Sequence, residues 1–260
     1  MAARDNVLFH ANVASGTASG TVVPFSMIYG IENVRQGYGT PILKSARAFY
    51  NGGGSNFTNA GIPIEIKNSN WIDSAGLVAE NFAAATVLNK DNVSYMRGRD
   101  KQLAPNTAWT IAATLPFATN AGLDMYVLLE IEYSDVAGIN AEKASGSPVM
   151  KKCANASVTI SSNTPGSIGS FDNLLQGVTY VLSEVSIKGN LTTPMFLVVE
   201  GFSNQRGLTR ILPMKATGLA DQIEGSVYLT KQTYSLSLIP CVALSAAAVE
   251  VQLEMIASSN

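Results

Sequence analysis

The sequence predicts an all-β protein that contains two tandem jelly-roll β-sandwiches, each with a short inserted helix. Three observations predict this fold class. Short runs alternate apolar and polar residues, Gly-, Asn- and Pro-rich breaks separate the runs, and similar runs recur in the same order in both halves of the 260-residue chain. Alternation with a period of two is typical of strands that turn one face to a core and the other to solvent. A parallel α/β sheet would need helices between its strands, and the sequence lacks them.

Candidate strands of the first half follow one another at intervals typical of a sandwich or jelly roll. The alternation is clearest at 125–133, where Val127 and Leu129 share one face and Glu130 and Glu132 share the other. Breaks such as "NGGGSN" at 51–56 indicate turns. The predicted strands are 6–13, 21–29, 41–50, 62–67, 93–97, 107–115 and 125–133.

The second half predicts an equivalent series of strands. In its last run, Val251 and Leu253 oppose Gln252 and Glu254, and the break "SSNTPGSIGS" at 161–170 indicates a loop. The predicted strands are 156–162, 178–188, 195–202, 208–213, 226–230, 233–244 and 249–255.

One segment in each half has a helical pattern. At 73–89 a plausible Asp or Ser cap precedes Leu77, Phe82, Ala85 and Leu88 at near-helical spacing, and a shorter candidate occupies 214–225. We expect a short helix between the corresponding strands of both sandwiches.

The recurrence of sequence blocks predicts a tandem duplication. Residues 115–134 overlay 239–258 without a gap, with Pro116 on Pro240 and Glu130 on Glu254. Three further blocks keep the order, and chance overlay of alternating strands is the alternative explanation. The further pairs are 42–51 with 181–190, 61–70 with 195–204, and 93–96 with 226–229. The predicted domains are a first jelly roll at 1–136, a polar Gly/Ser/Ala-rich linker at 137–152, and a second jelly roll at 153–260.

The composition argues against nucleic-acid binding and favours a covered surface. Apolar residues make up 47% of the chain, but charged residues only 14%, and the formal net charge is −2. A weakly charged surface suits a protein whose faces are covered by neighbours, and no basic run could wrap nucleic acid. Because the N-terminus lacks the apolar region of a signal peptide and no run approaches 18 apolar residues, we expect a soluble, unsecreted protein.

The chemistry of the side chains favours no enzyme. The single histidine, His10, rules out sites that need several histidines, such as HExxH, and a structural or exposed role is expected for it. Glu130 and Glu132 could form a carboxylate pair for glycoside hydrolysis or calcium binding, but Glu254 and Ile256 do not repeat the pair. The solvated face of a strand is the favoured interpretation. The sequence therefore predicts no catalytic, cofactor-binding or metal-ligating residue, and no cofactor.

Other conspicuous residues have structural interpretations. The glycines at 52–54 precede no phosphate-binding helix and predict a flexible turn, and "RGRDK" at 97–101 predicts a solvated loop or an interfacial ion pair. Two buried thiols are favoured for Cys153 and Cys241, with a disulfide left open. Trp71 and Trp109 are too few and too far apart in sequence to indicate a sugar-stacking platform, although they do not exclude one.

The block order, the length and the low charge resemble the double jelly-roll major capsid proteins of tailless icosahedral double-stranded DNA viruses, in particular their compact, corticovirus-like members. Each half closes on a similar strand, "VLLEIEYS" or "EVQLEMIAS". The resemblance covers essentially the whole chain but includes no signature motif. It implies a homotrimer that forms a pseudo-hexagonal capsomer of an icosahedral virion shell, made in the host cytoplasm. It also implies contacts with neighbouring capsomers, other virion proteins such as a vertex protein, and an internal membrane, with no specific nucleic-acid binding.

Two other functions are left open by the sequence. The first is a tandem β-sandwich module that binds carbohydrate or a cell surface, such as a phage tail or adhesin component. The second is a hydrolase on a sandwich scaffold, which the single histidine disfavours. A capsid protein would assemble into trimers and shells, whereas a binding module would remain a monomer or small oligomer.

Overall fold

The computed structural model describes residues 3–30, 41–69, 71, 74–82, 101–103, 108–133, 149–171, 179–189, 191, 193–201, 209–214, 218–219, 227–229 and 233–258. Apart from one 3₁₀ turn, Ser55–Phe57, every regular element in these ranges is a β-strand. The chain divides into two compact units, Ala2–Val136 and Ala137–Asn260, which we call the N-terminal and the C-terminal unit.

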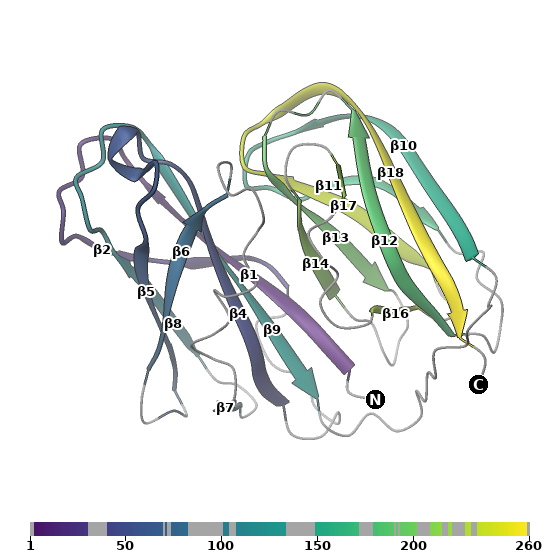
Figure 1. Cartoon of the computed structure of the whole chain (residues 1–260), viewed down its shortest axis with the longest axis horizontal. Helices are drawn as coiled ribbons and strands as arrows, with labels where there is room; N and C mark the ends of the chain where they lie inside the picture. The colour runs from purple at the N-terminus through teal and green to yellow at the C-terminus, as the bar shows by residue number, and fades with distance from the viewer. Residues whose placement is uncertain are drawn as a thin grey trace. The chain divides into compact units, whose positions relative to one another are not determined.

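The N-terminal unit has two layers of strands (Figure 1). One layer has the order β3-β1-β9-β4, with β7 also paired to β4, and the other has the order β2-β8-β5-β6. All strand pairs are antiparallel except β4 and β6, which join the two layers in parallel at Phe49 and Tyr50. The strands are β1 (Ala3–Val13), β2 (Val22–Pro24), β3 (Ser26–Tyr29), β4 (Pro41–Gly52), β5 (Ile62–Asn68), β6 (Ala75–Asn81), β7 (Lys101–Gln102), β8 (Trp109–Thr114) and β9 (Leu123–Tyr133).

The C-terminal unit also has two sheets. One has the order β10-β18-β12-β15, with β16 also paired to β12, and the other has the order β11-β17-β13-β14. The strands are β10 (Val149–Ile160), β11 (Gly166–Phe171), β12 (Thr179–Gly189), β13 (Met195–Gly201), β14 (Thr209–Met214), β15 (Gly218–Leu219), β16 (Val227–Leu229), β17 (Tyr234–Pro240) and β18 (Leu244–Ser258).

Both units have the strand order of a jelly roll. When the eight strands of a jelly roll are lettered B to I in chain order, its sheets read B-I-D-G and C-H-E-F. The N-terminal unit gives β1-β9-β4-β7 and β2-β8-β5-β6, and the C-terminal unit gives β10-β18-β12-β16 and β11-β17-β13-β14. We refer to these as the BIDG and CHEF sheets of each unit. The predicted all-β jelly-roll class is confirmed.

Alternating apolar side chains build a core between the sheets of each unit. In the N-terminal unit Ile64 and Ile66 of β5 and Val127 and Leu129 of β9 are buried. In the C-terminal unit the inward residues of β13, β17 and β18 form one cluster, which includes Leu197, Leu236 and Val251. Removing this apolar area from water is the main stabilising term of each sandwich.

A β-bulge occurs at the same place in both units. The pairing of β4 with β9 skips Lys44, because Leu43 lies opposite Ile131 and Ser45 opposite Glu130. The pairing of β12 with β18 skips Ser183, because Leu182 lies opposite Met255 and Glu184 opposite Glu254. These positions coincide in the overlay of 42–51 on 181–190 and of 115–134 on 239–258. The two units therefore share a local irregularity as well as a strand order.

One pair of overlaid blocks is out of register in its sheets. In β5 the core-facing residues are Ile62, Ile64 and Ile66, whereas in β13 they are Met195, Leu197 and Val199. The overlay of 61–70 on 195–204 places Ile64 on Val198, which points away from that core. The overlay of 115–134 on 239–258 holds for β9 and β18, because Val127 and Leu129 are buried in one core and Val251 and Leu253 in the other. A shift of one residue turns every side chain of a strand to the opposite face.

The predicted helices are wrong wherever the structure describes them. Residues 75–81 of the predicted helix 73–89 form strand β6, in which Ala75, Leu77 and Ala79 are buried and alternate with exposed Gly76 and Val78. Pairing with β5 stabilises this strand. In the segment 214–225, Met214 ends β14 and Gly218–Leu219 is a short strand on β12. The remainder of both segments lies outside the described residues.

Three further differences concern strand boundaries. Strand β11 occupies Gly166–Phe171, where the sequence predicts a loop, because it pairs with β17. Strand β10 begins at Val149, inside the predicted linker 137–152, because β18 is long enough to pair with it from Ile256. The predicted strand 21–29 is divided into β2, on the CHEF sheet, and β3, on the BIDG sheet. The predicted strand 93–97 lies outside the described residues.

Candidate assembly surfaces

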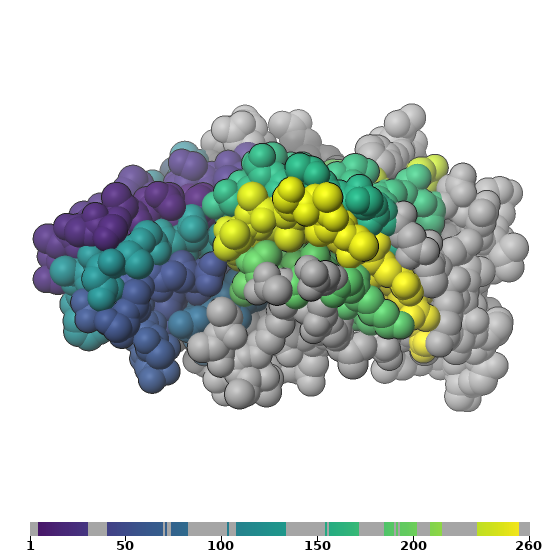
Figure 2. Space-filling view, turned by 90° about the horizontal axis from the view of Figure 1, so that it is seen from above, coloured from purple at the N-terminus to yellow at the C-terminus, as the bar shows by residue number. Residues whose placement is uncertain are grey.

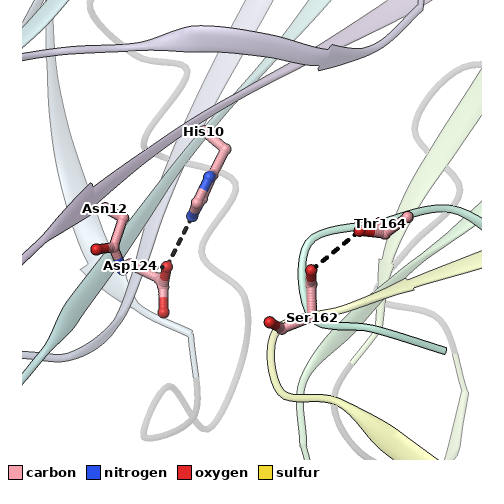
Figure 3. Close-up of polar contacts among 5 residues, drawn as sticks. All are labelled: His10, Asn12, Asp124, Ser162 and Thr164. Carbon is pink, nitrogen blue, oxygen red and sulfur yellow. Dashed lines mark hydrogen bonds and ion pairs between the residues drawn. The ribbon is translucent and has the colours of Figure 1, made fainter.

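His10 of β1 has a structural environment. Its Nε2 lies 2.7 Å from Asp124 Oδ1, and the Asn12 side chain donates to the same oxygen at 3.0 Å (Figure 3). The imidazole also lies 5.1 Å, centroid to centroid, from the ring of Tyr126. These contacts tie the start of β9 to β1.

Figure 3 also shows the Thr164 hydroxyl donating to the Ser162 carbonyl in the turn after β10, at 3.2 Å.

The carboxylates Glu130 and Glu132 lie on the outer face of the N-terminal BIDG sheet, as the alternation predicts. The prediction that this face is solvated is wrong for Glu130, which is only 8% exposed. Glu132 forms an ion pair with Lys44, the bulge residue, at 3.5 Å. Apolar residues of the same face, including Leu8 and Leu128, are buried as well. β9 is therefore buried on both faces along most of its length, which strict alternation does not indicate.

An aromatic cluster covers part of this outer face. Phe82, at the end of β6, stacks on Phe49 with a centroid distance of 4.8 Å and meets Tyr126 edge-on at 6.5 Å. The Arg47 guanidinium lies 5.3 Å from the Phe49 ring centroid. The sequence predicts Phe82 on a helix. The structure instead places it directly after β6, where it packs against β4 and β9.

The structure brings the two tryptophans together. Trp71 and Trp109 lie edge to face, with a centroid distance of 5.7 Å and an interplanar angle of 87°. Asn68 pairs with Trp109 across β5 and β8, and a turn from Asn68 returns Trp71 to the same place. Because the two tryptophans are far apart in sequence, the sequence pattern does not predict this contact. The pair is half-buried.

Three loops form one uncharged surface at an end of the N-terminal unit. The segments 14–21, 52–61 and 116–122 contain no Asp, Glu, Lys or Arg. They are joined by hydrogen bonds: Gly16 N donates to Thr119 O at 2.8 Å, Asn56 Nδ2 to Ala118 O at 3.0 Å, and Asn120 Nδ2 to Ser55 Oγ at 3.0 Å. Figure 2 shows their purple, blue and teal residues gathered at one end of this unit. The predicted Gly52–Gly54 turn belongs to this surface, and all three glycines have positive φ.

The C-terminal unit repeats this end. Its segments 161–165, 190–194 and 241–243 are also uncharged. Asn163 N donates to Pro240 O at 2.8 Å, and Cys241 N donates to Pro194 O at 3.0 Å. The turn between the last two strands exposes one large apolar side chain in each unit, Phe117 in the N-terminal unit and Val242 in the C-terminal unit.

One broad sheet face is exposed in the N-terminal unit. We call the outer face of its CHEF sheet the N-face. Its outward side chains on β5 are all exposed, and Val22 of β2 and Val78 of β6 are 64% and 38% exposed. Side chains that characterise the N-face are Val22, Pro24, Pro63, Glu65, Lys67 and Val78.

In the C-terminal unit the exposed face belongs to the other sheet. We call the outer face of its BIDG sheet the C-face, and Figure 2 shows residues of β10 and β18 at the surface there, in green and yellow. Its side chains include Ser157, Lys188, Ala248, Glu250, Gln252 and Glu254, which are exposed or half-buried. The outer face of the C-terminal CHEF sheet is instead apolar and buried, with Phe196, Val198 and Ile211 all at most 2% exposed.

The described residues contain no group suited to hold a metal ion: in those ranges His, Cys, Asp and Glu do not gather in threes or more. Cys241 is a buried thiol, and the side chain of Cys153 lies outside the description. Of the basic segment 97–101, only Lys101 is described, at the start of β7. Over the same ranges, no helix has the length and apolar character needed to cross a membrane.

Comparisons with known proteins find similar structures but no relatives by sequence. No family model matches the sequence, and no curated protein matches it. The chain is similar to the STIV MCP, a viral major capsid protein, with 9% identity, a TM-score of 0.28 and coverage of 96% of each chain. It is similar to the major capsid protein P2 from bacteriophage PM2, with 11% identity, a TM-score of 0.24 and coverage of 97% of this chain and 98% of that one. The PBSX exported protein XepA gives 11% identity, a TM-score of 0.22 and coverage of 94% and 84%.

Proposed function

We propose that this protein is a non-enzymatic structural protein that self-associates into a viral capsid, with three copies forming a pseudo-hexagonal capsomer of an icosahedral shell. The observation that carries the proposal is that one chain contains two jelly rolls with the same strand order and the same bulge. A tandem duplication is the simplest source of both features.

Duplication gives the capsomer its geometry. Three chains with two similar sandwiches each supply six similar units, which can surround one axis, while sequence differences between the units let each contact a different neighbour. The absence of charged residues from the loop ends supports this role, because large permanent interfaces bury weakly charged surface at little electrostatic cost.

The proposed domains follow the strands. A first jelly roll spans 1–136 and a second begins with β10, so the connecting segment is shorter than 137–152. Neighbouring capsomers, a vertex protein and an internal membrane are the proposed contacts in the virion. We place synthesis in the host cytoplasm and assign no specific nucleic-acid contact.

A carbohydrate- or cell-surface-binding module is the second candidate, and the contact between Trp71 and Trp109 is the observation that favours it. Aromatic side chains can stack on sugar rings, but an edge-to-face, half-buried pair presents little free ring surface. Binding of the purified protein to a glycan array, lost in Trp71→Ala, would support this candidate.

Native mass measurement of the purified full-length protein tests the capsid proposal. We expect trimers and, under assembly conditions, megadalton shells. A protein that stays monomeric across concentration and ionic strength would contradict the proposal and leave the binding module as the better function.

A further inference from the structure

Strand β10 is an edge of the C-terminal BIDG sheet. Among the strands that the structure describes, only β18 pairs with it, between Val149 and Ile160. Figure 1 shows β12, β18 and β10 side by side, with β10 outermost. In an antiparallel sheet, every second residue of an edge strand points its backbone N–H and C=O away from its one neighbour. β10 thus carries a row of backbone groups to which a further strand can bind.

The equivalent edge of the N-terminal unit already carries a further strand. There β1 pairs with β9 on one side and, at the three residues around Phe9, with antiparallel β3 on the other. Phe9 lies opposite Val127 of β9. Ala154 of β10 lies opposite Val251 of β18, and the two valines coincide in the sequence overlay of β9 on β18. Ala154 therefore corresponds to the middle of the stretch that β3 covers in the N-terminal unit.

The stretch Ala154–Val158 lacks the features that usually keep an edge strand from pairing with another chain. Such edges are blocked by charged side chains, by proline or by a bulge. This stretch contains no charged residue and no proline, and its pairing with β18 shifts register only after Val158. The small side chains of Ala154 and Ala156 pack against the core of their own unit. The sequence of β10 therefore leaves this part of the edge able to pair.

A second copy of β10 fits this edge. A two-fold axis at Ala154, near the middle of the strand, pairs β10 with itself in antiparallel orientation over nearly its whole length. In this register Lys151 lies opposite Ser157 and Lys152 lies opposite Ala156. These lysines are the only charged residues of β10. Since like charges that lie opposite each other destabilise a strand pair, the placement of both lysines opposite uncharged residues favours this register.

We propose that β10 of one copy pairs with β10 of a second copy, so that the C-terminal BIDG sheets of the two copies join into one continuous sheet. The contact is isologous, because both copies use the same strand, and it therefore ends at two copies. The inference rests on the proposed capsid function and adds to it a two-fold contact between copies of neighbouring capsomers. One strand pair is a weak contact by itself, and its repetition over a shell strengthens it.

Disulfide trapping tests both the contact and its register. Residues directly opposite each other in an antiparallel pair have Cα atoms about 4.5–5.5 Å apart, which is within the range of a disulfide. Ala154→Cys places two thiols in this position, in full-length protein that also carries Cys153→Ser to remove the adjacent native thiol. Ser157→Cys in the same background is the matched control. Ser157 is more exposed than Ala154, but in this register it lies roughly 20 Å from Ser157 of the second copy, at about 3.3 Å per residue.

We expect assembled Ala154→Cys protein to form disulfides between copies at least about tenfold faster than Ser157→Cys, because pairing raises the effective concentration of its thiols. Non-reducing electrophoresis and peptide mass spectrometry measure the rate and the position of the cross-link. Equal or slower cross-linking of Ala154→Cys in assembled shells would overturn the inference and leave the capsid function intact. Dimers that cross-link at residue 154 but form no shell would support the contact and contradict the capsid function. A monomeric wild type would overturn both.

Hydrogen exchange of the wild-type protein tests the same contact if Ala154→Cys fails to fold. The outward amides of Ala154–Val158 should exchange at least about tenfold more slowly in the assembled protein than in protein dissociated by dilution. Equal exchange of these amides in the two states, with assembly verified by native mass spectrometry, would overturn the inference.

Discussion

Gly52 ends β4 at a position that only glycine fits. Its φ is +93°, and an added Cβ would collide with the carbonyl oxygen of Gly122, just before β9. Gly189, on β12 of the C-terminal unit, has φ +143°, and its Cβ would collide with the carbonyl oxygen of Ala248. The close approach of neighbouring backbones at the ends of these strands thus depends on a missing side chain in each unit.

We predict that Gly52→Ala lowers the free energy of unfolding by about 1–3 kcal/mol, because alanine is strained at that φ and crowds a backbone carbonyl. Gly122→Ala is the control: a Cβ there meets nothing within 4 Å, so its effect should stay within about 0.5 kcal/mol. Urea titration followed by tryptophan fluorescence measures both, because both tryptophans lie in the N-terminal unit. Equal stability of the two variants would contradict the prediction.

Glu65 provides a second test at this scale. Its largest perturbation is the hydrogen bond from Ser74, followed by the hydrogen bond from Lys67, and both lower the pKa of the carboxyl. We predict that Ser74→Ala and Lys67→Met each raise that pKa, because each removes a hydrogen bond that stabilises the carboxylate. Carbon-detected NMR titration of the Glu65 carboxyl measures both shifts, and an unchanged pKa in Ser74→Ala would contradict the prediction.

The sign of the associated pH effect follows from the direction of the shift. Because the folded-state pKa of Glu65 lies below the unfolded value, its stabilising contribution is present above the unfolded pKa and disappears as the pH falls through the folded pKa. Ser74→Ala should reduce this acid-side dependence.

At the scale of elements, the shared bulge fixes the register of the central strands. Lys44 and Ser183 are the extra residues, and beyond each of them the strand resumes pairing with β9 or β18 with its apolar side chains facing inward. In the N-terminal unit the bulge also places Lys44 where it reaches Glu132. The irregularity is therefore part of how each sandwich closes.

Deletion of Lys44 should remove the bulge at a small cost, because Leu43 would still lie opposite Ile131 and Ser45 opposite Glu130, each on its present face. We expect the free energy of unfolding to fall by no more than about 1 kcal/mol, as for Lys44→Ala, which removes only the half-exposed ion pair. Thermal unfolding of both variants measures these changes. A deletion variant less stable than Lys44→Ala by several kcal/mol would show that the sandwich needs the bend of the bulge itself.

Sequence patterns predicted strands well where the two faces differ in polarity. β5 alternates isoleucines with exposed polar residues and was predicted almost to its ends. β6 was mistaken for a helix because its outward residues, Gly76 and Val78, give little contrast with buried Ala75 and Leu77. β11 was missed because its outward residues are Gly and Ser, which also mark loops.

The candidate surfaces were less predictable than the strands. Burial of Glu130 and contact of Trp71 with Trp109 depend on tertiary packing that no single strand reveals. The overlay located the last strand of each unit, but it placed β5 out of register with β13. The composition predicted a weakly charged surface, and the structure shows where three uncharged loops of the N-terminal unit meet.

The whole molecule combines two sandwiches of one topology with an unusually small charge, 14% of residues and a net charge of −2. In each unit one outer sheet face is exposed and another is largely buried, and the exposed face is CHEF in one unit and BIDG in the other. Repetition supplies similar building blocks, and this difference lets the two units offer different surfaces to their neighbours in the proposed capsid.

Assembly should depend weakly on salt. Since the loop ends carry no charged residue and Glu65 and Lys67 of the N-face already pair with each other, the concentration for half assembly should change by less than about tenfold between low salt and 0.5 M NaCl, where screening shortens the Debye length to about 4–5 Å. Light scattering over a salt series measures this. Dissociation by moderate salt would indicate that ion pairs outside the described faces hold the copies together.

Electron cryomicroscopy of the assembled protein tests the capsid proposal most directly. We predict a trimeric capsomer that shows six similar sandwich-shaped densities around its axis, with alternating N-terminal and C-terminal units, as part of a closed shell. Particles that contain one isolated chain, or an oligomer without this pseudo-sixfold arrangement, would contradict it.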